Sequence, residues 1–411
     1  MTDRLTRCGV FLTIILVTGG CSRSDSLLYT LTGNPVHRVP GQYRNGVTGA
    51  LERAGTNRPA LEKVIKTVEK DQVVGTAFLI AHMPDRDLRQ LGSDFLLENI
   101  RYAYRAFHET RWWDTVPETV FCNNVLPYAN IHERRDNWRQ DFYKRFSPLV
   151  RTCRTPGEAA VIINAEMWDM VNVHYSTKRP KADQSPYESI DASLASCTGL
   201  AILLVDACRA VGIPARFAGV ELWIDKSGNH SWVEVWSEGA WHALGAGEPG
   251  PLNETWFMDK AARTDPEDPR HWIYAVSWER TGLKYPVLWD TTVHYVSAVN
   301  VTDSYVQVQN DDDRVNIAFR LFEREGGPRV AAETVISSDG TVVGGGRTRS
   351  GRHDLNDMLN FDLLPEKTYN LTFIVEGIEY HYTVTATRAK FQVEEIYLED
   401  LRKTERRGAG R

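Results

Sequence analysis

The chain has 411 residues, of which 25% are charged and 42% hydrophobic, the balance of an ordinary folded protein. This composition excludes a disordered, collagen-like or coiled-coil chain, and the length predicts two or three domains. The net charge of −6 lacks the basic excess of a protein that neutralises phosphates, so we predict no nucleic-acid partner. Six cysteines are too few for a disulfide-built scaffold, and each is therefore interpreted separately.

The N-terminus has the layout of a secretory signal peptide over residues 1–20. Arg4 and Arg7 precede an apolar run at 10–17 that is far shorter than the roughly 20 residues of a membrane-spanning helix. The small residues before Cys21 resemble a bacterial lipoprotein signal, in which the cysteine carries the lipid anchor. We predict an exported protein of the cell envelope, lipid-anchored to a membrane at Cys21, with a secreted protein as the alternative.

The pattern of apolar residues changes along the chain. Helical spacing dominates the first half, a helix followed by three strands comes next, and short strands with turn signals such as Gly344-Gly345-Gly346 then predict a β-sandwich. The fold class is α+β, with a helical N-terminal region, an α+β core and a C-terminal antiparallel β-sandwich. The predicted parts are a signal peptide at 1–20, a tether at 21–49, a mainly helical region at 50–185, the core at 186–290, the β-sandwich at 291–390 and a helical, basic tail at 391–411.

Cys197 stands at the predicted start of the core helix. Ser196 before it is a good N-cap, and Gly212 ahead of Pro214 predicts the other end. Free backbone N–H groups in the first turn favour a thiolate, the nucleophilic form of cysteine. A lone cysteine here would be better explained by packing, so the assignment depends on a base nearby.

His230 supplies the candidate base. It begins a predicted strand whose alternation places His230, Trp232 and Glu234 on one face. A helix packed beside that strand can bring the sulfur of Cys197 to the imidazole. The two side chains would then form the nucleophile–base pair of thiol acyl chemistry.

The segments around both residues resemble the transglutaminase-like members of the papain-like cysteine enzymes. Their order and spacing match together over about residues 187–248. The matching segments are Ser196-Cys197-Thr198-Gly199, Cys208-Arg209-Ala210-Val211-Gly212-Ile213-Pro214-Ala215-Arg216, His230-Ser231-Trp232-Val233-Glu234-Val235-Trp236 and Gly239-Ala240-Trp241-His242. The resemblance implies a papain-like core in which Cys197 is the nucleophile and His230 the general base, acting on a carboxamide or peptide bond through a thioester.

The third catalytic residue departs from the family pattern. The usual aspartate follows the tryptophan of the third strand, and Gly245 holds that place here. Glu248 in the next loop is the preferred carboxylate, and Asn253 is the alternative, in the manner of the papain-like amide. The predicted catalytic residues are therefore Cys197, His230 and Glu248.

Other features predict no cofactor and no metal ion. The histidines and cysteines show no zinc-ligand spacing. The backbone N–H of Cys197 is the first candidate donor to an oxyanion, with Gln184 and Trp168 as open choices for the second. Cys122 and Cys153 either form a disulfide or are separate buried thiols.

Two functions are compatible with these residues. The preferred one is a cysteine enzyme that acts on amide or peptide bonds of a protein or peptide substrate, with a β-sandwich as accessory module. Its thioester is resolved by water, as in a peptidase or amidase, or by an amine, as in crosslinking, and the tendency of the bacterial branch of the superfamily favours water. The alternative is a catalytically inactive binding or structural protein at the cell surface, which Gly245 in place of the aspartate favours.

Overall fold

The computed structural model describes residues 29–30, 33–306 and 313–405, which form two compact units. The first unit comprises residues up to 93 except 82–84, and the second comprises those three residues and the chain from 94 onward. The predicted signal peptide and Cys21 lie outside the described residues, so the lipid anchor stays a prediction. Within the described ranges, no helix combines the length and the apolar composition that crossing a bilayer requires.

The first unit is built from short helices, and it begins earlier than the sequence predicts. The tether predicted at 21–49 is wrong from residue 35 onward, because α2 buries Val47, Ala50 and Leu51 on one face. A Cβ on Gly46 would stand 2.9 Å from the Cβ of Ala81, so this glycine serves close helix packing. The helices of this part are η1 (Pro35–Arg38), α2 (Gly41–Arg53), η2 (Gly55–Asn57), α3 (Arg58–Thr67), η3 (Lys70–Gln72), α4 (Val73–His82) and α5 (Asp85–Gln90).

The second unit also begins with helices, which confirms the predicted helical N-terminal region. Residues at helical spacing are buried as expected, among them Leu96, Ile100 and Ala103 in α6 and Ile163 and Met167 in α9. The helices up to the core are α6 (Ser93–His108), α7 (Glu118–Asn124), α8 (Arg139–Val150), α9 (Pro156–Val171) and α10 (Pro186–Ala192).

Arg139 connects these helices through a fully buried guanidinium. Its side chain is 1% exposed, and its Nε donates to Oδ1 of Asn99 at 2.6 Å. The Nη atoms donate to the carbonyl oxygens of Arg209 at 2.9 Å, Val125 at 2.9 Å and Pro127 at 2.8 Å. Burial lowers the pKa of Arg139 to about 9, and the carbonyl acceptors compensate for the lost hydration.

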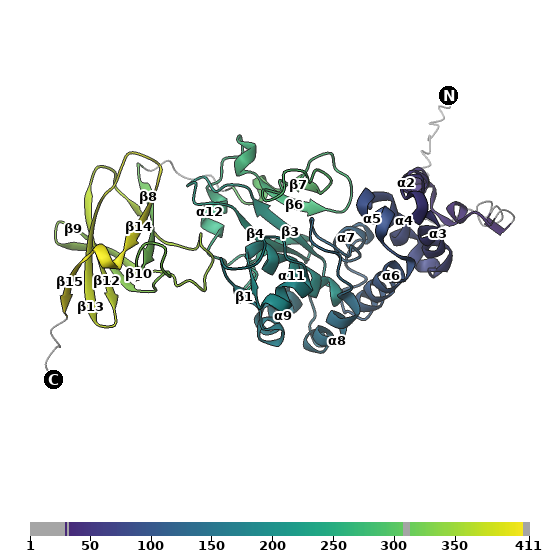
Figure 1. Ribbon diagram of the computed structural model, residues 1–411, viewed down its shortest axis with the longest axis horizontal. Coiled ribbons are helices and arrows are strands. Elements are labelled where there is room, and N and C mark those ends of the chain that lie inside the picture. The colour runs from purple at the N-terminus through teal and green to yellow at the C-terminus, as the bar shows by residue number, and fades with distance from the viewer. Residues whose placement is uncertain (1–28, 31–32, 307–312, 406–411) are drawn as a thin grey trace, which may run out of the picture. The chain divides into compact units, whose positions relative to one another are not determined.

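The core is a five-stranded sheet with one central helix, α11 (Cys197–Ala210), packed on β3 and β4 (Figure 1). The sheet order is β5-β4-β3-β6-β7, and every neighbouring pair is antiparallel. All residues of α11 after Cys197 are buried, because α8 and α9 also pack against this helix. The strands are β3 (Ala215–Val220), β4 (His230–Ser237), β5 (Ala240–Leu244), β6 (Ile273–Ser277) and β7 (Ser297–Asn300), and the smaller elements are β1 (His174–Tyr175), β2 (Leu194–Ala195), α12 (Met258–Ala262), η4 (Pro269–His271) and η5 (Thr302–Ser304).

The boundary predicted between the core and the sandwich, at 290–291, lies too early. β7 pairs with β6 at the edge of the core sheet, and the hydroxyl of Tyr305 donates to Oε1 of Glu234 in β4 at 2.7 Å. A short strand has the same alternation in either sheet, so its pairing partner cannot be deduced from its own pattern.

The C-terminal region is a sandwich of a five-stranded sheet, β10-β9-β12-β13-β15, and a three-stranded sheet, β11-β8-β14. Both sheets contribute to one core, which includes Phe319, Ile336, Leu371, Phe373 and Ile396. The β-sandwich is confirmed, with one departure from the antiparallel expectation, since β14 runs parallel to β8. The strands are β8 (Val315–Phe322), β9 (Glu333–Ser338), β10 (Thr341–Arg347), β11 (Leu359–Leu363), β12 (Thr368–Val375), β13 (Ile378–Thr385), β14 (Phe391–Tyr397) and β15 (Arg402–Glu405).

Two local predictions in this region are wrong. Of the helical tail predicted at 391–411, the described part, 391–405, is strand β14, a 3-10 turn η6 (Leu398–Asp400) and strand β15, and 406–411 lie outside the described residues. A short apolar stretch fits either period, and pairing with β8 decides. The glycines predicted as a turn lie inside β10. A Cβ on Gly344 would stand 3.0 Å from the Phe361 ring, and one on Gly346 would stand 2.6 Å from Leu359, so these glycines make room for β11.

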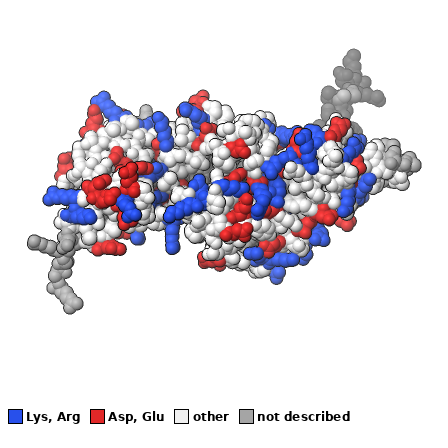
Figure 2. Space-filling model, in the orientation of Figure 1, with Lys and Arg blue, Asp and Glu red and all other residues white. Residues whose placement is uncertain are grey.

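Cys122 and Cys153 are free buried thiols, so of the two alternatives, a disulfide or separate thiols, the second is correct. Burial raises the pKa of the Cys122 thiol to about 12. Figure 2 shows acidic and basic side chains interspersed over the face drawn. Such mixing differs from the clustered basic face that is typical of a nucleic-acid-binding protein.

Replacing Arg139 by Met tests the buried guanidinium. We expect the free energy of unfolding to fall by about 3–5 kcal/mol, because buried oxygens lose their donor. Arg145→Met on the same helix is the matched control, since the Arg145 side chain is 41% exposed and forms a surface ion pair with Asp141. Urea denaturation followed by circular dichroism should show a change below about 1 kcal/mol for that control. Equal effects of the two substitutions would contradict the structural role of Arg139.

Candidate active site

Cys197 occupies the first position of α11, as the sequence predicts. The hydroxyl of Ser196 accepts from the N–H of Gly199 at 3.3 Å and donates to the carbonyl of Ala182 at 2.8 Å, which fixes the start of the helix. Cys197 is half-buried, whereas the other cysteines in the described part of the chain are buried. The thiol of Cys197 therefore lies at a cleft, whereas the other residues of α11 are buried.

His230 begins β4 within a group of aromatic rings. Its side chain is 3% exposed, and its ring centroid lies 4.7 Å from that of Trp256, 5.1 Å from that of Phe257 and 5.9 Å from that of Trp232. The next residue, Ser231, has its Oγ 3.2 Å from Oγ1 of Thr198 in α11. This contact joins the start of the helix to the start of the strand, so the predicted nucleophile and base come together.

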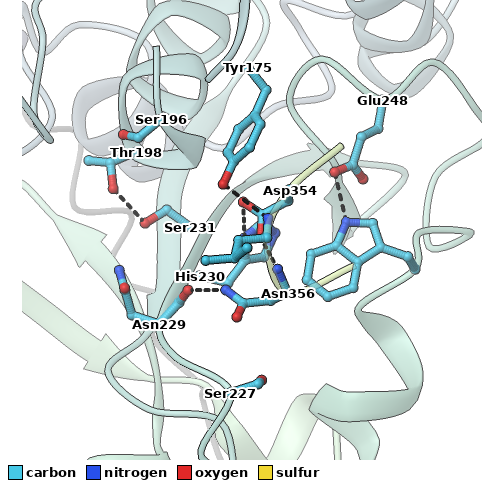
Figure 3. A network of polar contacts seen from close by, with 12 residues as sticks. Tyr175, Ser196, Thr198, Ser227, Asn229, His230, Ser231, Glu248, Asp354 and Asn356 are labelled. Carbon is cyan, nitrogen blue, oxygen red and sulfur yellow. Dashed lines mark hydrogen bonds and ion pairs between the residues drawn. The ribbon is translucent and has the colours of Figure 1, made fainter. Parts of the chain in front are cut away.

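The third member of the group is Asp354, which the sequence analysis did not identify. Its Oδ2 lies 3.5 Å from Nδ1 of His230, and its carboxylate is 4% exposed. One side-chain atom each of Cys197, His230 and Asp354 lies within 4.8 Å of the other two. Asp354 comes from the loop between β10 and β11, so the β-sandwich supplies the carboxylate that orients the imidazole (Figure 3).

The structure therefore places Asp354, not Glu248, against His230. The Oε1 of Glu248 accepts from the indole Nε1 of Trp256 at 2.7 Å instead. The alternative, Asn253, is also elsewhere, since its Nδ2 lies 3.0 Å from Nδ1 of His242. A Cβ on Gly245 would collide with the carboxylate of Glu248, so the place of the family's aspartate is taken by the Glu248 side chain.

Asn356 and Arg320 hold the loop of Asp354 on the segment that leads into β4. The Nδ2 of Asn356 donates to the carbonyl of Asn229 at 2.7 Å, and its backbone N–H donates to Oδ1 of Asp354 at 2.8 Å. An Nη of Arg320 donates to the carbonyl of Ser227 at 3.1 Å. These bonds fix the carboxylate and the start of the strand relative to each other.

Two further bonds complete the support of this loop. Arg329 donates to the carbonyl of Asp354 at 2.7 Å, and the backbone N–H of Leu355 donates to the hydroxyl of Tyr175 at 3.0 Å. Because its hydroxyl accepts that bond, Tyr175 retains its own proton for donation in the cleft. Burial raises the pKa of Tyr175, and the charges of Asp354 and Cys197 raise it further, so the phenol stays protonated.

The electrostatics favour a charged imidazole. Burial alone lowers the pKa of His230, but the negative charges of Asp354 and Cys197 raise it to about 10. Burial raises the pKa of Asp354, but the charge of His230 outweighs this and lowers it. His230 is therefore an imidazolium paired with a carboxylate, and both charges are compensated inside the protein.

Cys197, His230 and Asp354 line a cleft of about 880 Å³. Its lining also includes Trp168, Trp256, Glu248 and Tyr175. Of the two residues considered as second oxyanion donors, Gln184 donates from Nε2 to the carbonyl of Leu194 at 2.9 Å, and Trp168 donates from Nε1 to Oδ1 of Asn164 at 3.0 Å. Both are occupied by structural bonds. Tyr175 was missed because a tyrosine in a two-residue strand has no distinguishing pattern.

A comparison with protein families matches the part of the chain that carries Cys197 and His230. Residues 144–246 match the family model of the transglutaminase-like superfamily. The chain contains a transglutaminase-like domain. The matched range includes Cys197 and His230 and ends before Glu248 and Asp354, so the carboxylate on His230 comes from outside the transglutaminase-like domain.

No curated protein matches the chain. Among solved structures, the chain is similar to a proposed cysteine protease from Cytophaga hutchinsonii, with 22% sequence identity and a TM-score of 0.24, over 28% of this chain and 40% of that one.

Replacing the two candidate carboxylates separately tests the assignment. Without Asp354, burial lowers the pKa of His230 with less to oppose it, so the imidazolium loses its proton at a lower pH than in the wild type. We expect Asp354→Asn to slow iodoacetamide labelling of Cys197 by about tenfold or more near pH 7, since one pKa unit is a tenfold change in protonation. Peptide mass spectrometry across pH 5–9 separates Cys197 from Cys208, a buried thiol with a pKa raised to about 12. If Glu248→Gln slows the labelling of Cys197 more than Asp354→Asn does, Glu248 and not Asp354 orients His230.

Proposed function

We propose that this protein is a cysteine-dependent enzyme that acts on amide or peptide bonds of a protein or peptide substrate. The observation that carries the proposal is the buried contact of His230 with Asp354 beside the half-buried thiol of Cys197, in a cleft large enough for a peptide segment. A nucleophile, a base and an orienting carboxylate are the three groups that acyl transfer through a thioester requires.

In the first step, the Cys197 thiolate attacks the carbonyl carbon and a C–S bond forms. The carbonyl oxygen takes the negative charge, and we assign its stabilisation to the backbone N–H of Cys197 and the hydroxyl of Tyr175. The His230 imidazolium gives its proton to the leaving nitrogen as the C–N bond breaks. Asp354 keeps the ring oriented and compensates its charge, and a thioester on Cys197 remains.

In the second step, water or an amine attacks the thioester. His230 takes the proton of the attacking group, the C–S bond breaks and the Cys197 thiolate returns. Water yields a carboxylic acid, and an amine yields a new amide. We propose water as the usual acceptor, which makes the protein a peptidase or amidase.

The alternative function, a catalytically inactive binding or structural protein, is now less well supported. It rested on Gly245 standing where the family has an aspartate, and Asp354 supplies a carboxylate from a different part of the chain. A metal-binding alternative also deserves a control, because cysteine, histidine and aspartate are all zinc ligands. A zinc enzyme would lose activity with a chelator, whereas the thioester mechanism does not need a metal.

A peptide-library digest with and without an added primary amine tests the proposal. We expect hydrolysis that Cys197→Ala lowers by about a thousandfold or more and that a chelator leaves unchanged. Cys208→Ala is the matched control, since Cys208 lies in the same helix, α11, and its thiol is buried. Mass spectrometry distinguishes hydrolysed products from amine adducts. Turnover that survives in Cys197→Ala would disprove the proposed mechanism.

A further inference from the structure

Glu248 lies in the cleft without taking part in the proposed reaction. It is half-buried, lines the same cleft as Cys197 and His230, and is held through Oε1 by the indole of Trp256 (Figure 3). Its second oxygen, Oε2, has no hydrogen-bond partner among the described residues. A carboxylate so placed offers one fixed oxygen and one open oxygen to a ligand.

The surroundings leave this carboxyl group short of positive charge. Burial, followed by the charges of Asp354 and Asp357, raises the pKa of Glu248. The charge of His230 and the Trp256 hydrogen bond oppose them, and the net pKa is about 7. A carboxyl group in this condition gains most from a cationic ligand, since the ligand supplies the missing charge.

The two walls of the cleft differ in charge. The core contributes the exposed acids Asp169 and Glu254 as well as Glu248, whereas the lining arginines come from the sandwich loop. One of those, Arg349, is bound to both carboxylate oxygens of Asp357 at 3.0 and 2.9 Å. The core side of the cleft therefore presents unpaired negative charge to a bound substrate.

We propose, on the basis of the cysteine-enzyme function above, that Glu248 binds a primary ammonium group of the substrate beside the reacting thiol. The ammonium donates one hydrogen bond to Oε2 and lies against the faces of the cleft tryptophans, Trp256 and Trp168, which favour cations. The group can belong to the acyl donor, as a free N-terminus or a lysine, or to an attacking amine. Both sources present the same chemistry to Glu248.

Charged thiol reagents test the proposal without a known substrate. In an alkyl methanethiosulfonate, the Cys197 thiolate attacks the sulfenyl sulfur, a mixed disulfide forms and methanesulfinate leaves. The probes are the 2-aminoethyl and 3-aminopropyl reagents, the neutral methyl reagent and the anionic sulfonatoethyl reagent. Each rate at pH 8 is read at Cys197 by peptide mass spectrometry and divided by the rate of the same reagent with 2-mercaptoethanol.

We expect the wild-type protein to prefer at least one ammonium reagent over the neutral one by about tenfold, the usual strength of a hydrogen bond to a charged group. Glu248→Gln should abolish this preference. Gly245→Ala should do the same while keeping the charge, because the new Cβ displaces the Glu248 carboxylate from its place. Glu254→Gln is the matched control, which removes one exposed acid from the same cleft and should keep the preference.

The outcomes separate this proposal from the one it rests on. If iodoacetamide does not label Cys197 faster than Cys208, the cysteine-enzyme function fails and the ammonium site fails with it. If Cys197 is reactive but shows no preference, or if Glu254→Gln lowers the preference as much as Glu248→Gln, only the ammonium site is overturned. A preference that depends on Glu248 alone supports it.

Matched substrates then identify the source of the ammonium. The same peptides are compared with free and with acetylated amines, and pentylamine is added as an acceptor. A KM that rises on acetylation in the wild type but not in Glu248→Gln assigns the site to the acyl donor. Amide formation with pentylamine that depends on Glu248 assigns it to the attacking amine. If neither depends on Glu248, the proposal is wrong.

Discussion

The contact between His230 and Asp354 joins parts of the chain that are far apart in sequence, and the rest of the site depends on it. Two buried ionised groups are stable only when each compensates the other, because removing either one leaves an unpaired charge in the interior. The loop that carries Asp354 must therefore keep a fixed position on the segment before β4. The bonds from Arg320 and Asn356 to that segment meet this requirement.

This constraint changes the interpretation of the β-sandwich. A module for adhesion or general positioning could vary in its contacts without affecting the thiol. Here the sandwich contributes Asp354 to the imidazole, a hydrogen bond to Tyr175 and the cleft-lining arginines. Two of its buried cations, Arg320 and Arg329, are used to support the loop. The sandwich is thus a structural part of the candidate active site, and the transglutaminase-like domain alone lacks the carboxylate.

Local sequence signals predicted Cys197 and His230, because neighbouring residues in the chain determine the position of each. Ser196 caps a helix and Cys197 follows it, while His230 opens a strand with clear alternation, so each position follows from its neighbours in the chain. Asp354 has no such signal, because its role arises from the docking of one loop on another element. The same limit explains β7, which the sequence predicts as a strand but whose sheet is decided by pairing with β6. It also explains Gly344, which follows the turn pattern locally but packs against Phe361.

Gly245 stands where the family has its aspartate, and Asp354 supplies the carboxylate beside His230 instead. With no side chain at position 245, the Glu248 carboxylate fills the space where a family member has its aspartate, and it turns to the indole of Trp256. Two carboxyl groups then lie near one imidazole in different environments. Asp354 is paired and its pKa is lowered, whereas Glu248 is unpaired and its pKa is raised to about 7. Environments that drive two carboxyl groups apart in pKa suit them to different tasks, so Asp354 can serve the histidine while Glu248 remains free for a ligand.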